Sequence, residues 1–161
     1  TKKIIDQLCN IVKGKEKLLF IGNMYALRDW GYAGDYAEMM WLMLQQKKPD
    51  DFVIATGKQF TVKKFIEKTA KQLGFILTWK GKGFNEVGMI KKIINNSLNG
   101  IKIGQTIVKI DERYFRPSEV DKLRGDSKKA HKILKWKPKV NIDSLIKLML
   151  EEKLREIDKS I

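Results

Sequence analysis

The chain has 161 residues, of which 43% are hydrophobic and 32% are charged, so it suits one domain, or one domain with part of another, built around an apolar core. No apolar run reaches 18 residues and no signal peptide is recognisable, so we expect neither a membrane span nor a membrane partner. Cys9 is the only cysteine, which excludes an internal disulfide and favours a reducing, cytoplasmic setting.

The net charge of +14 raises the alternative of a basic nucleic-acid-binding module. Only five of the 33 basic residues are arginine, and the lysines are scattered along the whole chain. A nucleic-acid module would cluster its cations, with aromatic residues between them, on one element. We therefore expect no nucleic-acid partner.

The first third of the chain predicts two helices and a strand. Residues 2–13 place apolar side chains on one helical face, and residues 18–21 form a short apolar strand. A helix over 35–46 begins with a capping box of Asp35 and Glu38. Its methionine-rich apolar positions are typical of core packing.

The middle of the chain continues the alternation of strands and helices. Residues 52–55 predict a strand, and residues 75–79 predict another. Between them lies an amphipathic helix over 62–73, which Thr61 caps and Gly74 ends.

The last part is less regular. A glycine- and lysine-rich stretch predicts only a short helix at 89–95, and a strand follows at 106–110. Asp126 can cap a helix that reaches about residue 134, and Asn141 or Asp143 begins a final amphipathic helix. The fold class is therefore α/β, with strands too few and too short for a complete doubly wound domain. We expect a piece of a larger α/β protein.

No catalytic constellation is visible in the sequence. It contains no Gly-x-Gly-x-x-Gly run, P-loop, Gly-x-Ser-x-Gly elbow or His-Glu-x-x-His, and no tyrosine is followed four residues later by lysine. The one histidine, His131, lies among lysines and is expected at the surface. We predict no catalytic, cofactor-binding or metal-binding residue in this chain.

Two loops concentrate unusual residues. In the first, Arg28 lies between a strand and a helix, where its planar fork of donors suits a phosphate. The alternative is a structural salt bridge to Asp29 or Asp35. In the second, Arg116 suits a phosphate and the two oxygens of Glu119 match a ribose diol. The alternative there is that Glu119 only caps a helical turn.

These runs resemble the GDP-mannose 4,6-dehydratase family of extended short-chain dehydrogenases. The resemblance rests on Arg28-Asp29-Trp30-Gly31, on Phe52-Val53-Ile54-Ala55-Thr56-Gly57, on Arg113-Tyr114-Phe115-Arg116-Pro117-Ser118-Glu119-Val120-Asp121 and on Trp136-Lys137-Pro138. It implies that residues 1–161 are the C-terminal, substrate-binding portion of a Rossmann-type parent. The N-terminal cofactor domain and the family's catalytic residues would precede Thr1.

The resemblance also implies a chemistry and a binding site. Such enzymes use NADP to convert GDP-mannose to GDP-4-keto-6-deoxymannose by internal hydride transfer and loss of water. Lys3, Arg28, Arg116 and Glu119 match the family's substrate contacts, while Tyr32 and Gly34 depart from its usual His and Lys. We expect the chain alone to be inactive and the full-length parent to be a homo-oligomer.

Two further readings stay open. One is another NAD(P)-dependent sugar-nucleotide epimerase or dehydratase of the wider family. The other is a structural or interaction domain in which the two loops act only as caps.

Overall fold

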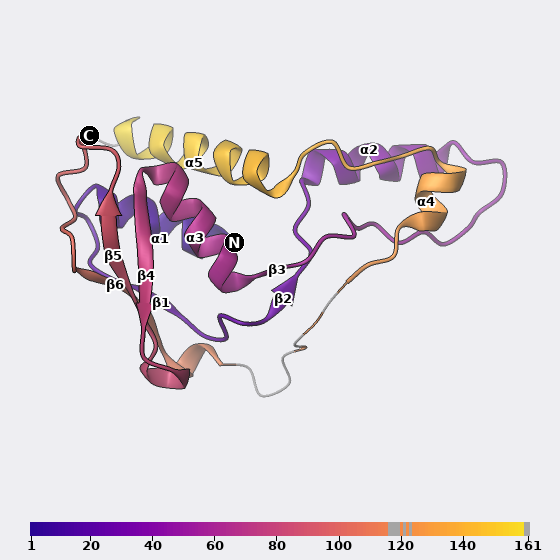
Figure 1. The fold of residues 1–161 in the computed structure, drawn as a ribbon. Coiled ribbons are helices and arrows are strands. Elements are labelled where there is room, and N and C mark those ends of the chain that lie inside the picture. The colour runs from indigo at the N-terminus through magenta and orange to yellow at the C-terminus, as the bar shows by residue number, and fades with distance from the viewer. Residues whose placement is uncertain (116–119, 121, 123, 160–161) are drawn as a thin grey trace.

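The structure is a computed structural model that describes residues 1–115, 120, 122 and 124–159. A main body consists of three helices packed together over one face of a sheet, as Figure 1 shows. The helices are α1 (Lys2–Val12), α3 (Val62–Leu73) and α5 (Ile142–Lys159). The apolar faces of α1 and α3 meet the sheet, and α5 packs on these two helices. Together they form the larger of two buried clusters, which includes Leu8, Phe65 and Ile146.

The sheet of the main body has four strands in the order β1-β6-β5-β4. They are β1 (Leu19–Ile21), β4 (Phe75–Lys80), β5 (Val87–Ile93) and β6 (Thr106–Ile110). The pair β1 and β6 is parallel, and the other two pairs are antiparallel. Two short strands, β2 (Leu27–Arg28) and β3 (Phe60–Thr61), form a separate antiparallel pair.

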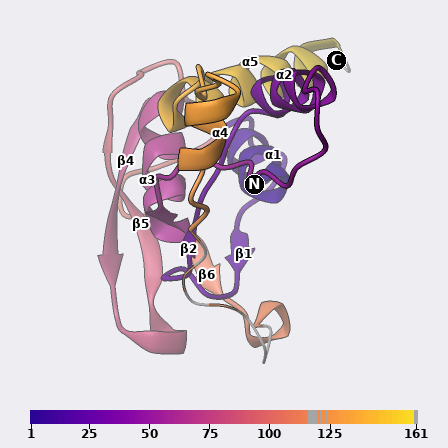
Figure 2. The same ribbon diagram turned by 90° about the vertical axis from the view of Figure 1, so that its right-hand side faces the viewer.

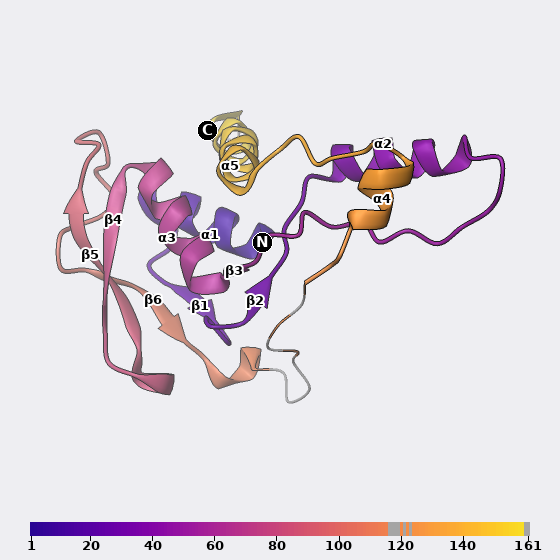
Figure 3. The ribbon, with the colours of Figure 1, turned by 45° about the vertical axis from the view of Figure 1, so that its right-hand side comes forward.

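A smaller lobe projects from the main body, as Figures 1 and 3 show. It holds α2 (Ala33–Leu44) and α4 (Lys128–Ile133), which lie side by side in Figure 2 as well. Its own buried cluster consists of Met39, Ala130, Leu134 and Trp136. His131 is half-buried here rather than at the open surface, and its ring lies 6.0 Å from that of Trp136.

Helix caps account for several confirmed predictions. The Thr61 hydroxyl accepts a hydrogen bond from Lys64 N at 3.0 Å at the start of α3, and Gly74 ends that helix with φ of 100°. Of the two residues predicted to begin the last helix, Asn141 is the cap, since its side-chain oxygen accepts from the amides of Asp143 and Ser144. The helix over 2–13 and the strands at 18–21, 75–79 and 106–110 are also confirmed.

The predicted capping box of α2 is wrong. Helix α2 already begins at Ala33, so Asp35 lies inside its first turn. The buried Asp35 carboxylate instead accepts hydrogen bonds from Lys139 N and Val140 N, both at 2.9 Å, and Glu38 pairs with the Lys139 ammonium at 2.6 Å. These acids therefore hold α2 against the segment that leads into α5.

The sequence predicted that the apolar residues of α2 pack in the core, but several of them do not. Met39 is fully buried, but Met40, Trp41 and Leu44 are 51%, 60% and 82% exposed. The small lobe has too little material around α2 to cover more than one face of it.

Three other predictions also differ from the structure. Of residues 89–95, which were predicted as a helix, residues 89–93 belong to β5, because pairing with both β4 and β6 overrides their weak helical pattern. Residues 52–55, predicted as a strand, pair with no strand in the described part of the chain. Helix α4 begins at Lys128 with Ser127 at the cap position, and Asp126 accepts from Lys128 N just before it.

Candidate functional site

A pocket of about 360 Å³ lies where the start of α1, the end of β1 and the end of β2 meet. It brings together Lys3 and Arg28, two of the four residues predicted to bind substrate. Its full lining is Thr1, Lys3, Ile4, Ile21, Gly22, Asn23, Arg28, Trp30, Val62 and Tyr114. We call it the Lys3–Arg28 pocket.

Lys3 enters the pocket from the first turn of α1. Its ammonium lies 3.1 Å from the centroid of the Tyr114 ring, which belongs to a short 3₁₀ turn, η2 (Glu112–Tyr114). A cation over an aromatic face is attracted by the negative charge of that face. Lys3 is thereby held beside the loop in which Arg116 and Glu119 were predicted to act.

The loop after β1 forms one wall of the pocket, which we call the first wall. The Asn23 side-chain oxygen accepts hydrogen bonds from Tyr25 N at 2.9 Å and Ala26 N at 3.1 Å, which fixes a tight turn. Gly22 lies so close to the second loop that a Cβ there would come within 2.3 Å of the Tyr114 carbonyl oxygen. A glycine at position 22 lets the two loops touch.

Arg28 ends β2, opposite Phe60, and so belongs to a strand rather than to the predicted loop. Its Nη1 donates to the Leu27 carbonyl at 2.8 Å and to the Val120 carbonyl at 2.7 Å. Leu27 also forms a parallel bridge with Lys122. The guanidinium therefore joins the first loop to the far side of the second.

The two carboxylates considered as structural partners of Arg28 have other roles. Asp29 accepts hydrogen bonds from the Thr56 amide and hydroxyl and from Gly57 N, and so fixes that turn. Asp35 holds the backbone at Lys139 and Val140.

Arg116 and Glu119, the other two predicted ligands, lie outside the described residues. Their neighbours on either side are described: Tyr114 lies under Lys3, and the Val120 carbonyl binds Arg28. The structure therefore brings the flanks of the second loop to the pocket.

A buried ion pair beside the pocket was missed by sequence reasoning. Glu86 is 3% exposed, and its carboxylate accepts from the Tyr25 hydroxyl and from the Lys63 ammonium, both at 2.6 Å. Burial alone raises the pKa of Glu86, but the hydrogen bonds from Lys63 and Tyr25 outweigh it and hold the pKa below its usual range. The pKa of Lys63 is raised, because hydrogen bonding to Glu86 and Tyr25 outweighs the opposite effect of burial. Since Tyr25 and Glu86 are 61 residues apart, no local pattern could reveal the pair.

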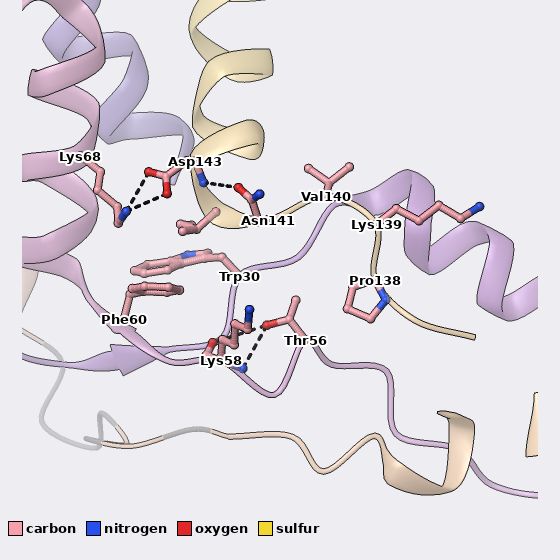
Figure 4. Close-up of a pocket in the computed structure, with 11 residues that line it drawn as sticks. Trp30, Thr56, Lys58, Phe60, Lys68, Pro138, Lys139, Val140, Asn141 and Asp143 are labelled. Carbon is pink, nitrogen blue, oxygen red and sulfur yellow. Dashed lines mark hydrogen bonds and ion pairs between the residues drawn. The ribbon is translucent and has the colours of Figure 1, made fainter. Parts of the chain in front are cut away.

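A second pocket, of about 430 Å³, lies beside the first and shares Trp30 with it (Figure 4). Trp30 and Phe60 form its apolar wall, and Lys68 binds both oxygens of Asp143, at 2.7 and 2.9 Å. Lys139, at the rim, pairs with Glu38. Carboxylates thus compensate two of its cations, which makes it a poorer place for an anion.

The Lys3–Arg28 pocket offers two cationic side chains to an anionic ligand. It is lined by two cations, and none of its lining residues that the structure describes is acidic. A guanidinium and an ammonium that line one pocket can bind phosphate oxygens. The described residues contain no group of three or more His, Cys, Asp and Glu side chains that could hold a metal ion. In the same described part, no helix has the length and apolar character needed to cross a bilayer.

Comparison with solved structures identifies the fold. RMD from Pseudomonas aeruginosa, solved with NADPH, superposes with a TM-score of 0.70 at 15% identity, over 96% of this chain and 42% of that one. A dTDP-glucose 4,6-dehydratase from Bacillus anthracis, solved with NAD, superposes with a TM-score of 0.61 at 13% identity. This match covers 96% of this chain and 38% of that one. This chain therefore shares its mixed α/β fold with part of each of these two proteins.

Comparison of sequences identifies the family. The family described as GDP-mannose 4,6 dehydratase matches residues 1–149. The chain is 48% identical to a GDP-mannose 4,6-dehydratase of Vibrio cholerae over 155 residues, and 43% identical to the human enzyme of that name over 150 residues. These alignments cover 96% and 93% of this chain but only 42% and 38% of the relatives. The chain belongs to the GDP-mannose 4,6-dehydratase family.

Proposed function

We propose that this chain is the C-terminal, GDP-sugar-binding portion of a GDP-mannose 4,6-dehydratase, a lyase that converts GDP-mannose to GDP-4-keto-6-deoxymannose. The observation that carries the proposal is the 48% identity to the Vibrio cholerae relative along nearly the whole chain. The convergence of Lys3 and Arg28 in one pocket supports it. The alternative of a nucleic-acid-binding module is not favoured, because relatives with this degree of identity are named as sugar-nucleotide enzymes.

The ligands of the proposed site divide between the diphosphate and the ribose of the nucleotide. Lys3 and Arg28 neutralise the diphosphate, for which their positive charges and donors are suited. Arg116 adds a second guanidinium, and Glu119 accepts from the two ribose hydroxyls.

The NADP cofactor belongs to polypeptide outside this chain. A dinucleotide needs a glycine-rich turn that leads from a strand directly into a helix. Here β1 leads through Gly22 and Asn23 into β2 instead, so these residues do not fit that role. On this proposal the chain alone binds GDP weakly and catalyses no turnover. We also propose, from the resemblance to the family, that the full-length parent is a cytoplasmic homo-oligomer.

A chimera tests this proposal. The present chain would replace the aligned region of the Vibrio cholerae relative, whose remaining portion would supply the cofactor domain. We expect the chimera to convert GDP-mannose to a product that has lost one water, detected by mass spectrometry. In the same background, Arg28→Ala should lower kcat/KM by about 100-fold, since charge-assisted hydrogen bonds to the ligand are lost.

Arg155 supplies the matched control. It is an exposed arginine of α5 that pairs with Glu152, so Arg155→Ala should leave kcat/KM unchanged. A folded, NADP-bound chimera that fails to bind GDP-mannose would contradict the proposed function. Equal activity of the two alanine variants would contradict only the placement of the site.

A further inference from the structure

The turn between β4 and β5, residues 81–86, reaches the first wall of the Lys3–Arg28 pocket through Glu86. The Glu86 carboxylate binds the Tyr25 hydroxyl and the Lys63 ammonium at 2.6 Å each. Lys63 N also donates to the Met24 carbonyl at 2.8 Å. The loop after β1 is therefore fixed at two points. Glu86 binds the side chain of Tyr25, and the Lys63 amide binds the backbone carbonyl of Met24.

The second wall of the pocket is formed by η2, which contributes Tyr114, and the same turn reaches it through Phe84. Its ring lies 5.0 Å from the ring of Phe115, at an interplanar angle of 57°. Tilted aromatic pairs at this distance are attractive beyond the apolar area that they bury. Phe115 directly follows Tyr114, whose ring supports Lys3 in the pocket.

The geometry of the turn requires its glycines. Gly81 has φ of 89°, and a Cβ there would come within 2.3 Å of the Asn85 carbonyl oxygen. The short 3₁₀ turn η1 (Gly83–Asn85) then places Phe84 and Glu86 on the two walls. Between these contacts, the walls meet where Gly22 approaches Tyr114.

We propose that residues 81–86 form a brace that positions both walls of the Lys3–Arg28 pocket, with Glu86 and Phe84 as positioning residues. The brace touches neither Lys3 nor Arg28 in any described contact. It acts through Tyr25 on one side and Phe115 on the other. The effect of the brace on nucleotide affinity rests on the proposed function. Its coupling of the two pocket walls does not.

Amide hydrogen exchange on the 161-residue chain tests the coupling without a ligand. Glu86→Gln removes the charge that binds Lys63, so exchange should accelerate at least five-fold at Ala26 and Lys63, whose amides bond within or to the loop after β1. Phe84→Ala should accelerate exchange of the Phe115 amide, which donates to the Glu112 carbonyl. Exchange at Ala26 should change little in this variant. Phe84→Tyr keeps the ring contact and should behave as the unmodified chain.

Glu38→Gln is the matched control for Glu86→Gln. It breaks an ion pair of the same 2.6 Å length, between Glu38 and Lys139, in the small lobe. It should leave exchange at Ala26, Lys63 and Phe115 unchanged. If the exchange rates of these amides in Glu86→Gln and Phe84→Ala equal those in Glu38→Gln, the proposed brace is contradicted.

A GDP titration followed by the amide shifts of Asn23 and Tyr114 tests the link to function. We expect weak binding to the unmodified chain and at least a three-fold higher Kd for Glu86→Gln and Phe84→Ala, with Phe84→Tyr and Glu38→Gln unchanged. If GDP shifts no pocket amide of the unmodified chain, the proposed function loses support while exchange still decides the brace. If GDP binds all variants equally, the brace has no positioning role.

Discussion

At the scale of single residues, Cys9 combines full burial with an unreactive thiol. Burial, with a smaller contribution from the charge of Asp6, raises the pKa of the thiol to about 11. Only the thiolate is nucleophilic, so a native Cys9 should resist a thiol reagent at pH 8 and react only when the main body unfolds. The measurement is the rate of alkylation with and without denaturant.

The same raised pKa predicts a loss of stability in alkali. A group whose pKa is higher in the folded protein than in the unfolded chain stabilises the protein at any pH below the unfolded pKa. For Cys9 the unfolded pKa is 9.0, and this contribution is lost as the pH rises through the folded pKa of about 11. The free energy of unfolding should therefore fall by about 2 to 3 kcal/mol across this window. Cys9→Ala should unfold with a flatter pH dependence, and parallel curves for the two proteins would contradict the prediction.

Individual site residues were predictable only where a local motif marked them. Arg28 and Lys3 were predicted from short runs that resemble the family, and both line one pocket in the structure, while their binding of substrate stays a prediction. Glu86 carries no local signal, because its partners Tyr25 and Lys63 reach it from 61 and 23 residues away. The roles of Arg116 and Glu119 remain predictions, since they lie outside the described residues.

At the scale of elements, α2 presents one buried and one exposed apolar face. Met39 is fully buried against α4, so Met39→Ala should cost about 2 to 5 kcal/mol of the stability of the small lobe. Trp41, on the same helix, is 60% exposed, and Trp41→Ala should change that stability by less than about 0.5 kcal/mol. Exchange of the α4 amides reports both values. A larger loss for Trp41→Ala would show that its exposed position is wrong.

The elements that the sequence predicted correctly are those whose signals are local. Helix α3 has an amphipathic face, a threonine cap and a terminal glycine, and all three act within the helix. Strand β5 was mistaken for a helix because its stability comes from partners on both sides rather than from its own pattern. Residues 52–55 have the composition of a strand, but a strand also needs a partner, which the sequence of one segment does not specify.

At the scale of the whole molecule, two buried clusters divide the chain into units of unequal stability. The larger cluster joins three helices and the sheet, while the smaller one has four fully or nearly fully buried members. Small cores with few buried contacts open at lower free energy. We therefore expect the amides of His131 and Leu134 to exchange faster than those of Ile66 and Ala70 under native conditions. Equal protection at both places would mean that the chain opens as one cooperative unit.

The chain passes between the main body and the small lobe four times, since buried residues of α1, α2, α3, α4 and α5 alternate between the two clusters. This alternation has a consequence for synthesis on the ribosome. The Trp136 indole donates to the carbonyl of Asp35, 101 residues earlier. At about 5 to 20 residues per second, α2 waits on the order of 5 to 20 s for this partner. During that interval its apolar side chains are uncovered, so a nascent chain stalled before α4 is the state in which a chaperone would find α2.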